Sequence, residues 1–134
     1  MSKPWIHASS DAKLWGIKPE DTLPIHDLMD SSKAAVGSNL HRALTHNAWF
    51  IGTILEKIFG TYITAQNGRI IQVRDIGERH VLQDFGNKFI PTAEDWITTM
   101  QVQPWQLGRG CPPSFKPLEA FHGTSEKQSF RIID

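Results

Sequence analysis

The strongest constraint on the fold is a run of apolar residues at helical spacing between Ser38 and Gly60. The stripe consists of Leu40, Leu44, Ile51, Leu55 and Ile58, widened by Ala43, Phe50 and Ile54. An apolar face of this width is typical of a helix buried in a protein core. Ser38 is a suitable N-cap and Gly60 a suitable C-terminal stop. We therefore predict one long central helix over residues 38–59, with the other helices packed around it.

The remaining elements complete an α+β prediction. Asn67-Gly68 separates two strand-like runs, 61–65 and 70–74, and predicts a hairpin because a type I′ turn needs positive φ at both central residues. Further helices are predicted within residues 1–20, over 24–36, from 75 to 85 and after residue 91. Asp75 and Glu78 have the spacing of a capping box, as do Thr92 and Asp95. Residues 1–106 are expected to form one globular domain. Residues 107–134 are expected to form an irregular C-terminal extension that packs on this domain or on a partner.

Charge and cysteine content narrow the classes of function. The chain has 14 Lys and Arg residues and 14 Asp and Glu residues, so its formal net charge is zero. This balance argues against a nucleic-acid-binding protein, which needs a basic surface. The single cysteine excludes an intrachain disulfide and is consistent with a reducing compartment. The sequence shows no signal peptide and no apolar run long enough for a membrane span, so we expect a soluble, cytoplasmic protein.

Ionisable side chains are concentrated in three of the predicted helical stretches. Histidine titrates near neutrality and ligates metals, so such a concentration indicates a candidate site. The candidate residues for a catalytic or binding pocket are His26, Asp30, Lys33, His41, Arg42, His46, Asn47, Glu78 and His80. His26, His46 and His80 are predicted to meet in one pocket although they belong to three different helices. If a divalent metal is the cofactor, its candidate ligands are His26, Asp30, His46 and His80.

Helical geometry suggests a functional role for several of these residues, and for some of them a purely structural one as well. His26 and Asp30 are four residues apart and could share a ligand, although a surface ion pair has the same spacing. His41 and His46 lie about 140° apart on a continuous helix, so they are not expected to hold one ion together. Arg42 could bind an anionic substrate together with Lys33. For His46 the alternative is hydrogen bonding between helices.

Asn47 and Glu78 have more local interpretations. Asn47 lies within the apolar stripe, so we predict that it is buried and hydrogen-bonded to the histidine and carboxylate cluster. Glu78 could act in the pocket or simply close the capping box with Asp75.

Four segments carry a resemblance to a known family. They are HDLMDSSK (26–33), HRALTHN (41–47), VRDIGERHVLQD (73–84) and IPTAEDW (90–96). Together they resemble a family of small bacterial and tailed-phage proteins classed as a domain of unknown function, over about residues 5–106. The resemblance implies a bacterial or phage origin, with the host cytoplasm or the virion as location, but no activity. The doublet His26-Asp27 is also similar to that of the HD-type metal phosphohydrolases, in which case His7 would be the upstream metal histidine.

Two functions follow from this sequence. The first is a small protein with a His/Asp/Glu/Arg pocket, which acts as a metal-assisted hydrolase or binds a small anionic ligand. The second is a non-enzymatic phage accessory or virion protein that acts through protein contacts, with the polar cluster serving only the structure. Oligomerisation is compatible with both.

Overall fold

The computed structural model describes residues 3–114, which belong to two compact units, Met1–Met100 and a second that begins at Gln101. The first unit contains helices α1 (Pro4–Trp15), α2 (Leu23–Asp30), α3 (Arg42–Thr45), α4 (Glu56–Phe59), α5 (Val73–Asp84) and α6 (Ala93–Ile97), and strands β1 (Tyr62–Thr64) and β2 (Ile70–Gln72). Short 3₁₀ helices cover Pro19–Asp21, Ser31–Ala34 and Asn39–His41, and a π-helical segment, η4, covers Phe50–Leu55. The second unit contains a 3₁₀ helix, Pro104–Leu107. The predicted α+β class is therefore confirmed.

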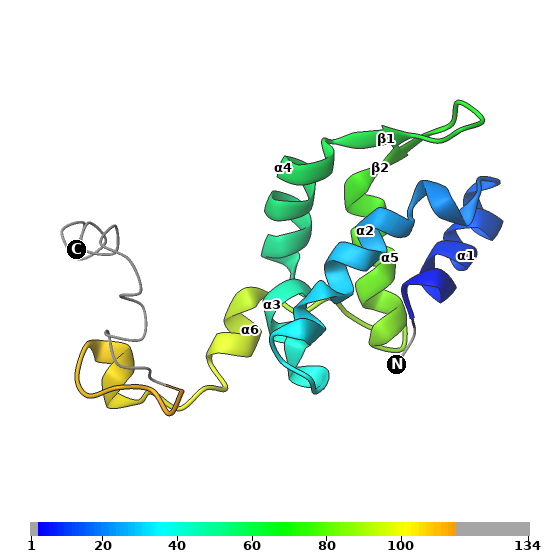
Figure 1. Cartoon of the computed structure of the whole chain (residues 1–134). Coiled ribbons are helices and arrows are strands. Elements are labelled where there is room, and N and C mark those ends of the chain that lie inside the picture. Colours follow the sequence, from blue (N-terminus) through cyan, green and yellow to red (C-terminus); the bar gives the residue numbers. More distant parts are fainter. Residues whose placement is uncertain (1–2, 115–134) are drawn as a thin grey trace. The chain divides into compact units, whose positions relative to one another are not determined.

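Helices α1, α2 and α5 pack against one another, with α2 and α5 in the middle of the first unit and α1 at its edge (Figure 1). Apolar residues of α2, η4 and α5 fill the core beside them: Ile25, Met29, Ile51, Leu55, Val73, Ile76 and Val81. Gly77 permits the close approach of α5 to η4, because a Cβ at this position would lie 2.6 Å from Leu55 Cδ1. The polar cluster described below lies where α1, α2 and α5 meet.

The prediction of one long helix over residues 38–59 is wrong. The chain leaves helical geometry at His46 (φ −97°, ψ 61°), so that α3 ends there and a second helical stretch runs through η4 and α4. The side chain of Asn47 explains the break. Its Nδ2 donates to the Ala43 carbonyl over 3.1 Å, and its Oδ1 accepts from the Phe50 amide over 2.8 Å, so it caps the end of one helix and the start of the next.

This break changes the outcome of two further predictions. Asn47 is buried, as predicted, but its partners are backbone groups of its own segment rather than the polar cluster. Leu40 and Leu44 belong to the predicted apolar stripe, yet they are 67% and 50% exposed. Within the stripe only Ile51 and Leu55 are buried, where η4 packs on α5, and Ile58 at its end is 57% exposed.

The predicted hairpin is confirmed. Strands β1 and β2 are antiparallel, with Ile63 opposite Ile71. The predicted type I′ turn is wrong, because Gly68 has a positive φ of 90° but Asn67 does not. Instead the Gly68 amide donates to the Ala65 carbonyl over 2.8 Å, and the glycine takes the left-handed position at the end of a longer loop. The predicted start of the next helix at Asp75 is wrong, since α5 begins at Val73 directly after β2. In contrast, the capping box of Thr92 and Asp95 at the start of α6 is present. None of the helices in the described part of the chain is long and apolar enough to cross a membrane.

Candidate metal centre

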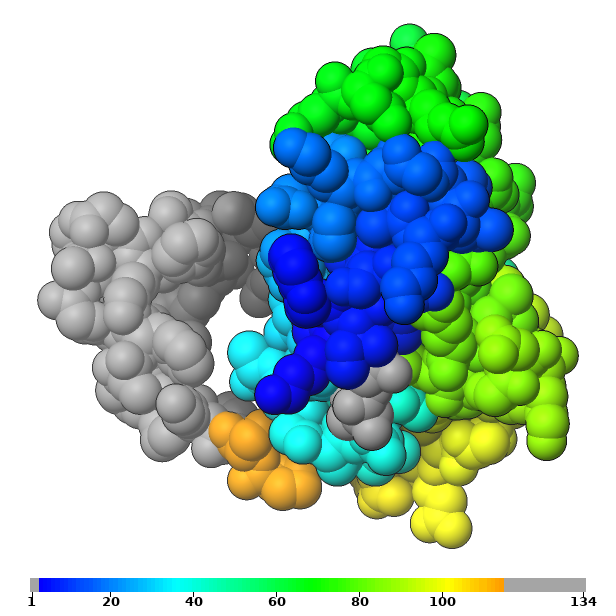
Figure 2. Space-filling model, turned by 90° about the vertical axis from the view of Figure 1, so that its right-hand side faces the viewer, coloured from blue at the N-terminus to red at the C-terminus, as the bar shows by residue number. Residues whose placement is uncertain are grey.

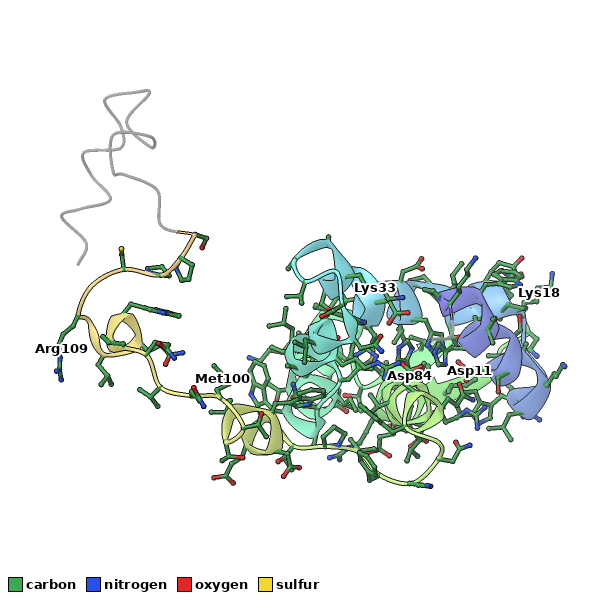
Figure 3. The ribbon with its side chains drawn as sticks, turned by 90° about the horizontal axis from the view of Figure 1, so that it is seen from below. Asp11, Lys18, Lys33, Asp84, Met100 and Arg109 are labelled. Atoms are coloured by element: carbon green, nitrogen blue, oxygen red, sulfur yellow. The ribbon has the colours of Figure 1, made fainter. Side chains whose placement is uncertain are left out.

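Three helices each contribute a histidine and an aspartate four residues apart. The pairs are His7/Asp11 on α1, His26/Asp30 on α2 and His80/Asp84 on α5. A spacing of four residues places both side chains on one face of a helix. These faces meet between the helices, and all six side chains are almost completely buried. Helix α1 forms part of the face seen in Figure 2, and Figure 3 shows Asp11 and Asp84 inside the helical unit.

A fourth histidine enters the cluster from the break after α3. Because the chain turns at His46, its ring points toward α5 instead of continuing around α3. His46 Nε2 lies 3.0 Å from Asp84 Oδ2 and 3.1 Å from His80 Nε2. Trp96 Nε1 donates to the His46 carbonyl over 3.3 Å, which ties the turn to α6.

A chain of buried hydrogen bonds fixes where His80 carries its proton. Arg79 Nε donates to Asp11 Oδ1 over 3.1 Å, so Asp11 is held as a carboxylate. His26 Nε2 lies 2.5 Å from Asp11 Oδ2 and must donate to it. The Nδ1 of a neutral His26 is then an acceptor, and it lies 2.8 Å from His80 Nδ1, which must donate. The Nε2 of a neutral His80 is consequently left with a lone pair and no proton.

The same reasoning shows which ring nitrogen of His46 carries the proton. The Thr45 hydroxyl donates to the Met29 carbonyl over 2.6 Å, so its proton is already used. Thr45 Oγ1 is 2.8 Å from His46 Nδ1 and must accept a hydrogen bond from it. The Nε2 of a neutral His46 therefore also carries a lone pair. Such outer partners, which hold one ring nitrogen as a donor and leave the other bare, are typical of histidines that ligate metals.

Four acceptor atoms converge in the middle of this network: Asp30 Oδ1, His46 Nε2, His80 Nε2 and Asp84 Oδ2. Five of the separations among them are 3.0, 3.1, 3.2, 3.5 and 3.6 Å, and all four atoms lie within 4.8 Å of one another. At metal–ligand distances of about 2.1 Å, adjacent ligands lie about 3.4 Å apart around a tetrahedral ion and about 3.0 Å apart around an octahedral ion. The four residues therefore have both the chemistry and the spacing of a metal-ligand set. We call them the four-ligand set.

The charges of these groups agree with that assignment. Burial lowers the pKa of His80 to about 4, more than the contact with the Asp30 carboxylate raises it, so the ring is neutral at pH 7. Burial raises the pKa of Asp84, but its contacts with His46 and His7 outweigh burial and hold the pKa well below the usual range. The pKa of Asp30 is also lowered, because contacts with His80 and Lys33 outweigh burial. Two carboxylates thus face two ring nitrogens, and the arrangement is stable only with protons on those nitrogens or with a cation in their place.

A second grouping, formed by His7, His26 and His80, is less suited to an ion. The three rings are stacked, with interplanar angles of 19°, 20° and 27°, so lone pairs in the ring planes run nearly parallel rather than converging. His7 Nδ1 is also engaged, because it donates to Gln83 Oε1 over 2.6 Å. Its Nε2 lies 3.3 Å from Asp84 Oδ1 without hydrogen-bond geometry. Burial lowers the pKa of His7, but the Asp84 carboxylate and Gln83 raise it more, which favours an ion pair with Asp84.

The other predicted pocket residues lie at different distances from this centre. Lys33 and Arg42 border it, with Lys33 Nζ 3.7 Å from Asp30 Oδ2 and Arg42 Nη2 3.9 Å from Asp84 Oδ1. Figure 3 shows Lys33 at the edge of the helical unit. His26 contacts His80 but supports it from behind rather than joining the four-ligand set. The structure thus brings His26, His46 and His80 together through direct contacts.

Three expectations about individual residues are wrong. His41 and His46 are not on opposite sides of a helix: because the helix ends between them, their ring centroids are 5.4 Å apart in an edge-to-face contact. His41 Nδ1 lies 2.7 Å from the Ser32 hydroxyl, and His41 is not one of the four-ligand set. Glu78 forms a surface ion pair with Arg74 and lies outside the cluster. Asp27 is exposed, so the His26-Asp27 doublet does not act as a pair of metal ligands here.

Sequence reasoning left Asp11 out of the site and did not include Asp84 among the candidate residues. A signal for both was present: the pattern of histidine followed four residues later by aspartate occurs three times, at residues 7, 26 and 80. Three such copies on three helices predict three matching faces, which a single copy does not. The contact of the His46 ring with the Thr45 hydroxyl depends on the helix break and carries no comparable signal.

Comparison with known proteins identifies a family but no relative of known activity. No curated protein and no solved structure shows significant similarity to the chain. A family described as a domain of unknown function, DUF6915, matches residues 2–106, which include every residue of the cluster. The chain therefore belongs to the DUF6915 family.

Proposed function

We propose that the protein binds one divalent transition-metal ion through Asp30, His46, His80 and Asp84. The observation that carries this proposal is the convergence of four buried acceptor atoms whose separations fit the coordination shell of such an ion. The outer hydrogen bonds from Asp11 through His26, and from Thr45, support it because they leave both ligand nitrogens bare.

The donor set limits the identity of the metal. Imidazole nitrogens favour zinc, iron and nickel, whereas carboxylates also suit manganese. Calcium is disfavoured because it takes six to eight oxygen ligands. We therefore propose a first-row transition metal that takes mixed imidazole and carboxylate ligands, such as zinc, iron, nickel or manganese.

Metal binding can be tested on protein purified without a histidine tag, stripped with a chelator and titrated calorimetrically with Zn²⁺ and Mn²⁺. We expect about one equivalent to bind, and a metal present at 100 times its Kd should stabilise the fold by about 2.7 kcal/mol. Asp84→Asn should weaken binding at least tenfold, whereas Asp75→Asn, on the exposed face of the same helix, should not. Binding of less than about 0.1 equivalent, with no shift in melting temperature, would reject the metal centre.

The finer proposal is that the metal serves hydrolysis of an anionic substrate. A bound divalent ion lowers the pKa of water and polarises the bond to be cleaved. Lys33 and Arg42, at the border of the four-ligand set, supply the positive charge that such a substrate needs. Hydrolysis of p-nitrophenyl phosphate and bis-p-nitrophenyl phosphate by the metal-loaded protein, abolished by Asp84→Asn, is the expected result.

The complete burial of the histidines favours a second candidate function, that of a non-enzymatic protein acting through contacts with partners. His26, His46 and His80 are all 0% exposed and contact one another, as expected for a network that serves only the structure. Apolar side chains are exposed elsewhere, including Trp49 at 55% and Val102 at 70%, as expected for a protein that acts through contacts with partners. A protein that takes up no metal but forms a stable complex or oligomer would establish this alternative.

Origin, location and domain organisation remain proposals based on the sequence. The segments that resemble bacterial and tailed-phage proteins support an origin in one of these, and the single cysteine supports the cytoplasm or a virion. We also propose that residues 107–134 pack on the globular domain or on a partner. Most of that segment, residues 115–134, lies outside the described residues.

A further inference from the structure

We infer that Arg42, with Lys33, forms an oxyanion-binding site beside the proposed metal, and that it takes the phosphate group of a substrate or ligand. This inference rests on the proposed metal centre and specifies the chemical class that the centre receives.

The guanidinium of Arg42 is held in place beside Asp84 by an aromatic ring. Its central carbon lies 5.3 Å from the centroid of the Phe85 ring, over the ring face, and the side chain is only 12% exposed. Stacking of this kind fixes the guanidinium plane and leaves its N–H donors free at the edge. Within residues 3–114 the buried Nε of Arg42 has no hydrogen-bond partner. The approach of Arg42 Nη2 to Asp84 Oδ1, at 3.9 Å, is too long for a hydrogen bond.

A metal ion bound by the four-ligand set would change the charge balance around Lys33 and Arg42. Without it, Lys33 and Arg42 offset the charges of Asp30 and Asp84. A divalent ion would cancel those two carboxylate charges while both imidazoles remain neutral. Lys33 and Arg42 would then have no counter-charge within the described cluster. The metal-loaded protein therefore carries local excess positive charge at this border, which an anion can neutralise.

The geometry favours an oxyanion that bridges two groups. Asp84 contributes Oδ2 to the four-ligand set, and its other oxygen, Oδ1, lies nearest Arg42. Only one carboxylate therefore separates the guanidinium from the metal position. A tetrahedral oxyanion can place one oxygen on the metal and another against the N–H edge of Arg42, which is the geometry that guanidinium groups recognise in phosphate. Lys33, on the Asp30 side, adds a flexible point charge.

Calorimetric titration with inorganic phosphate tests the inference on the full chain, with the metal at one equivalent. We expect phosphate to bind the metal-loaded protein at least tenfold more tightly than the metal-free protein. Arg42→Ala should weaken phosphate binding by about tenfold or more, because it removes charge-assisted hydrogen bonds. The same variant should change metal affinity less than threefold. Arg74→Ala, at an exposed ion pair with Glu78, is the matched control and should bind phosphate like the wild type.

The possible outcomes separate the two proposals. Metal uptake without phosphate binding at 10 mM, roughly the weak limit of useful recognition, would overturn this inference and leave the metal centre standing. Equal phosphate affinity in wild type and Arg42→Ala would overturn the role of Arg42. Failure to take up metal would overturn both. If Arg42→Ala does not fold, Arg42→Lys replaces it: retained charge without the planar donor edge should still weaken phosphate binding several-fold.

Discussion

Replacing Asp11 with asparagine should weaken metal binding although Asp11 lies outside the four-ligand set. The carboxylate accepts from Arg79 at Oδ1 and from His26 at Oδ2, and it is 0% exposed. An amide of the same shape has only one acceptor oxygen. Because Arg79 is charged and only donates, the amide oxygen should face Arg79 and the NH₂ group should face His26. His26 would then carry its proton on Nδ1 and donate to His80 Nδ1. His80 would be left with its proton on Nε2, at the position where the metal binds.

The expected loss is that of a typical outer-partner substitution at a metal site, about 10- to 100-fold in affinity. This corresponds to about 1.4–2.7 kcal/mol. Zinc titration calorimetry at pH 7.5 gives the affinity, and ¹⁵N–¹H correlation spectra of the histidine rings report the tautomers. Asp27→Asn, at an exposed position of α2, is the control and should leave both unchanged. Wild-type zinc affinity in Asp11→Asn, with His80 still protonated on Nδ1, would refute the proposed hydrogen-bond chain.

Three further predictions concern stability. In the folded, metal-free protein the pKa of His80 is lowered to about 4, whereas in the unfolded chain it has the ordinary value of about 6.5. As pH falls, the unfolded chain therefore takes up the proton first and is stabilised relative to the folded protein. Protonation of His80 should therefore lower the free energy of unfolding by on the order of 3 kcal/mol between about pH 6.5 and pH 4. Urea titrations across this range measure that loss. If the free energy of unfolding of His80→Gln falls with pH as steeply as that of the wild type, the prediction is wrong. Asn47→Ala removes the cap on the Phe50 amide and should cost about 1–2 kcal/mol, whereas a melting curve like the wild type would mean that the cap is not needed. Gly77→Ala places a Cβ 2.6 Å from Leu55 Cδ1 and should cost about 1–3 kcal/mol; Leu55→Ala in the same background should recover part of the packing, and additive losses would contradict that mechanism.

The sequence was sufficient for features set by local rules. The hairpin between β1 and β2 and the Thr92–Asp95 capping box are present because short segments set them, although the hairpin turn is not the predicted type I′ turn. The contact of His26 with His80 also followed from local spacing, since each residue lies on the inner face of its own helix.

The missed features arise where side-chain capping of the backbone competes with the helix that the apolar spacing favours. Apolar spacing favoured one helix over residues 38–59, but the side chain of Asn47 satisfies backbone groups on both sides of a break. Asparagine is neutral or unfavourable inside helices and favourable at caps, so this was the residue at which to expect an interruption. The turn it creates decides where His46 points. An error in one helix therefore became an error in the geometry of His41 and His46.

The distance along the chain between the proposed ligands has a kinetic consequence. The ligand His80 lies beside the ligand Asp30 across 50 residues and beside His26 across 54, and Gln83 contacts His7 across 76. Closing loops of this length is slow compared with forming the helices themselves, so α5 should dock onto α1 and α2 late in folding. The complete ligand set exists only after this docking. Metal should therefore leave the refolding rate nearly unchanged and slow unfolding instead, because interactions absent from the transition state act on the unfolding step. Stopped-flow chevrons recorded with and without zinc should then coincide on the folding arm and separate on the unfolding arm.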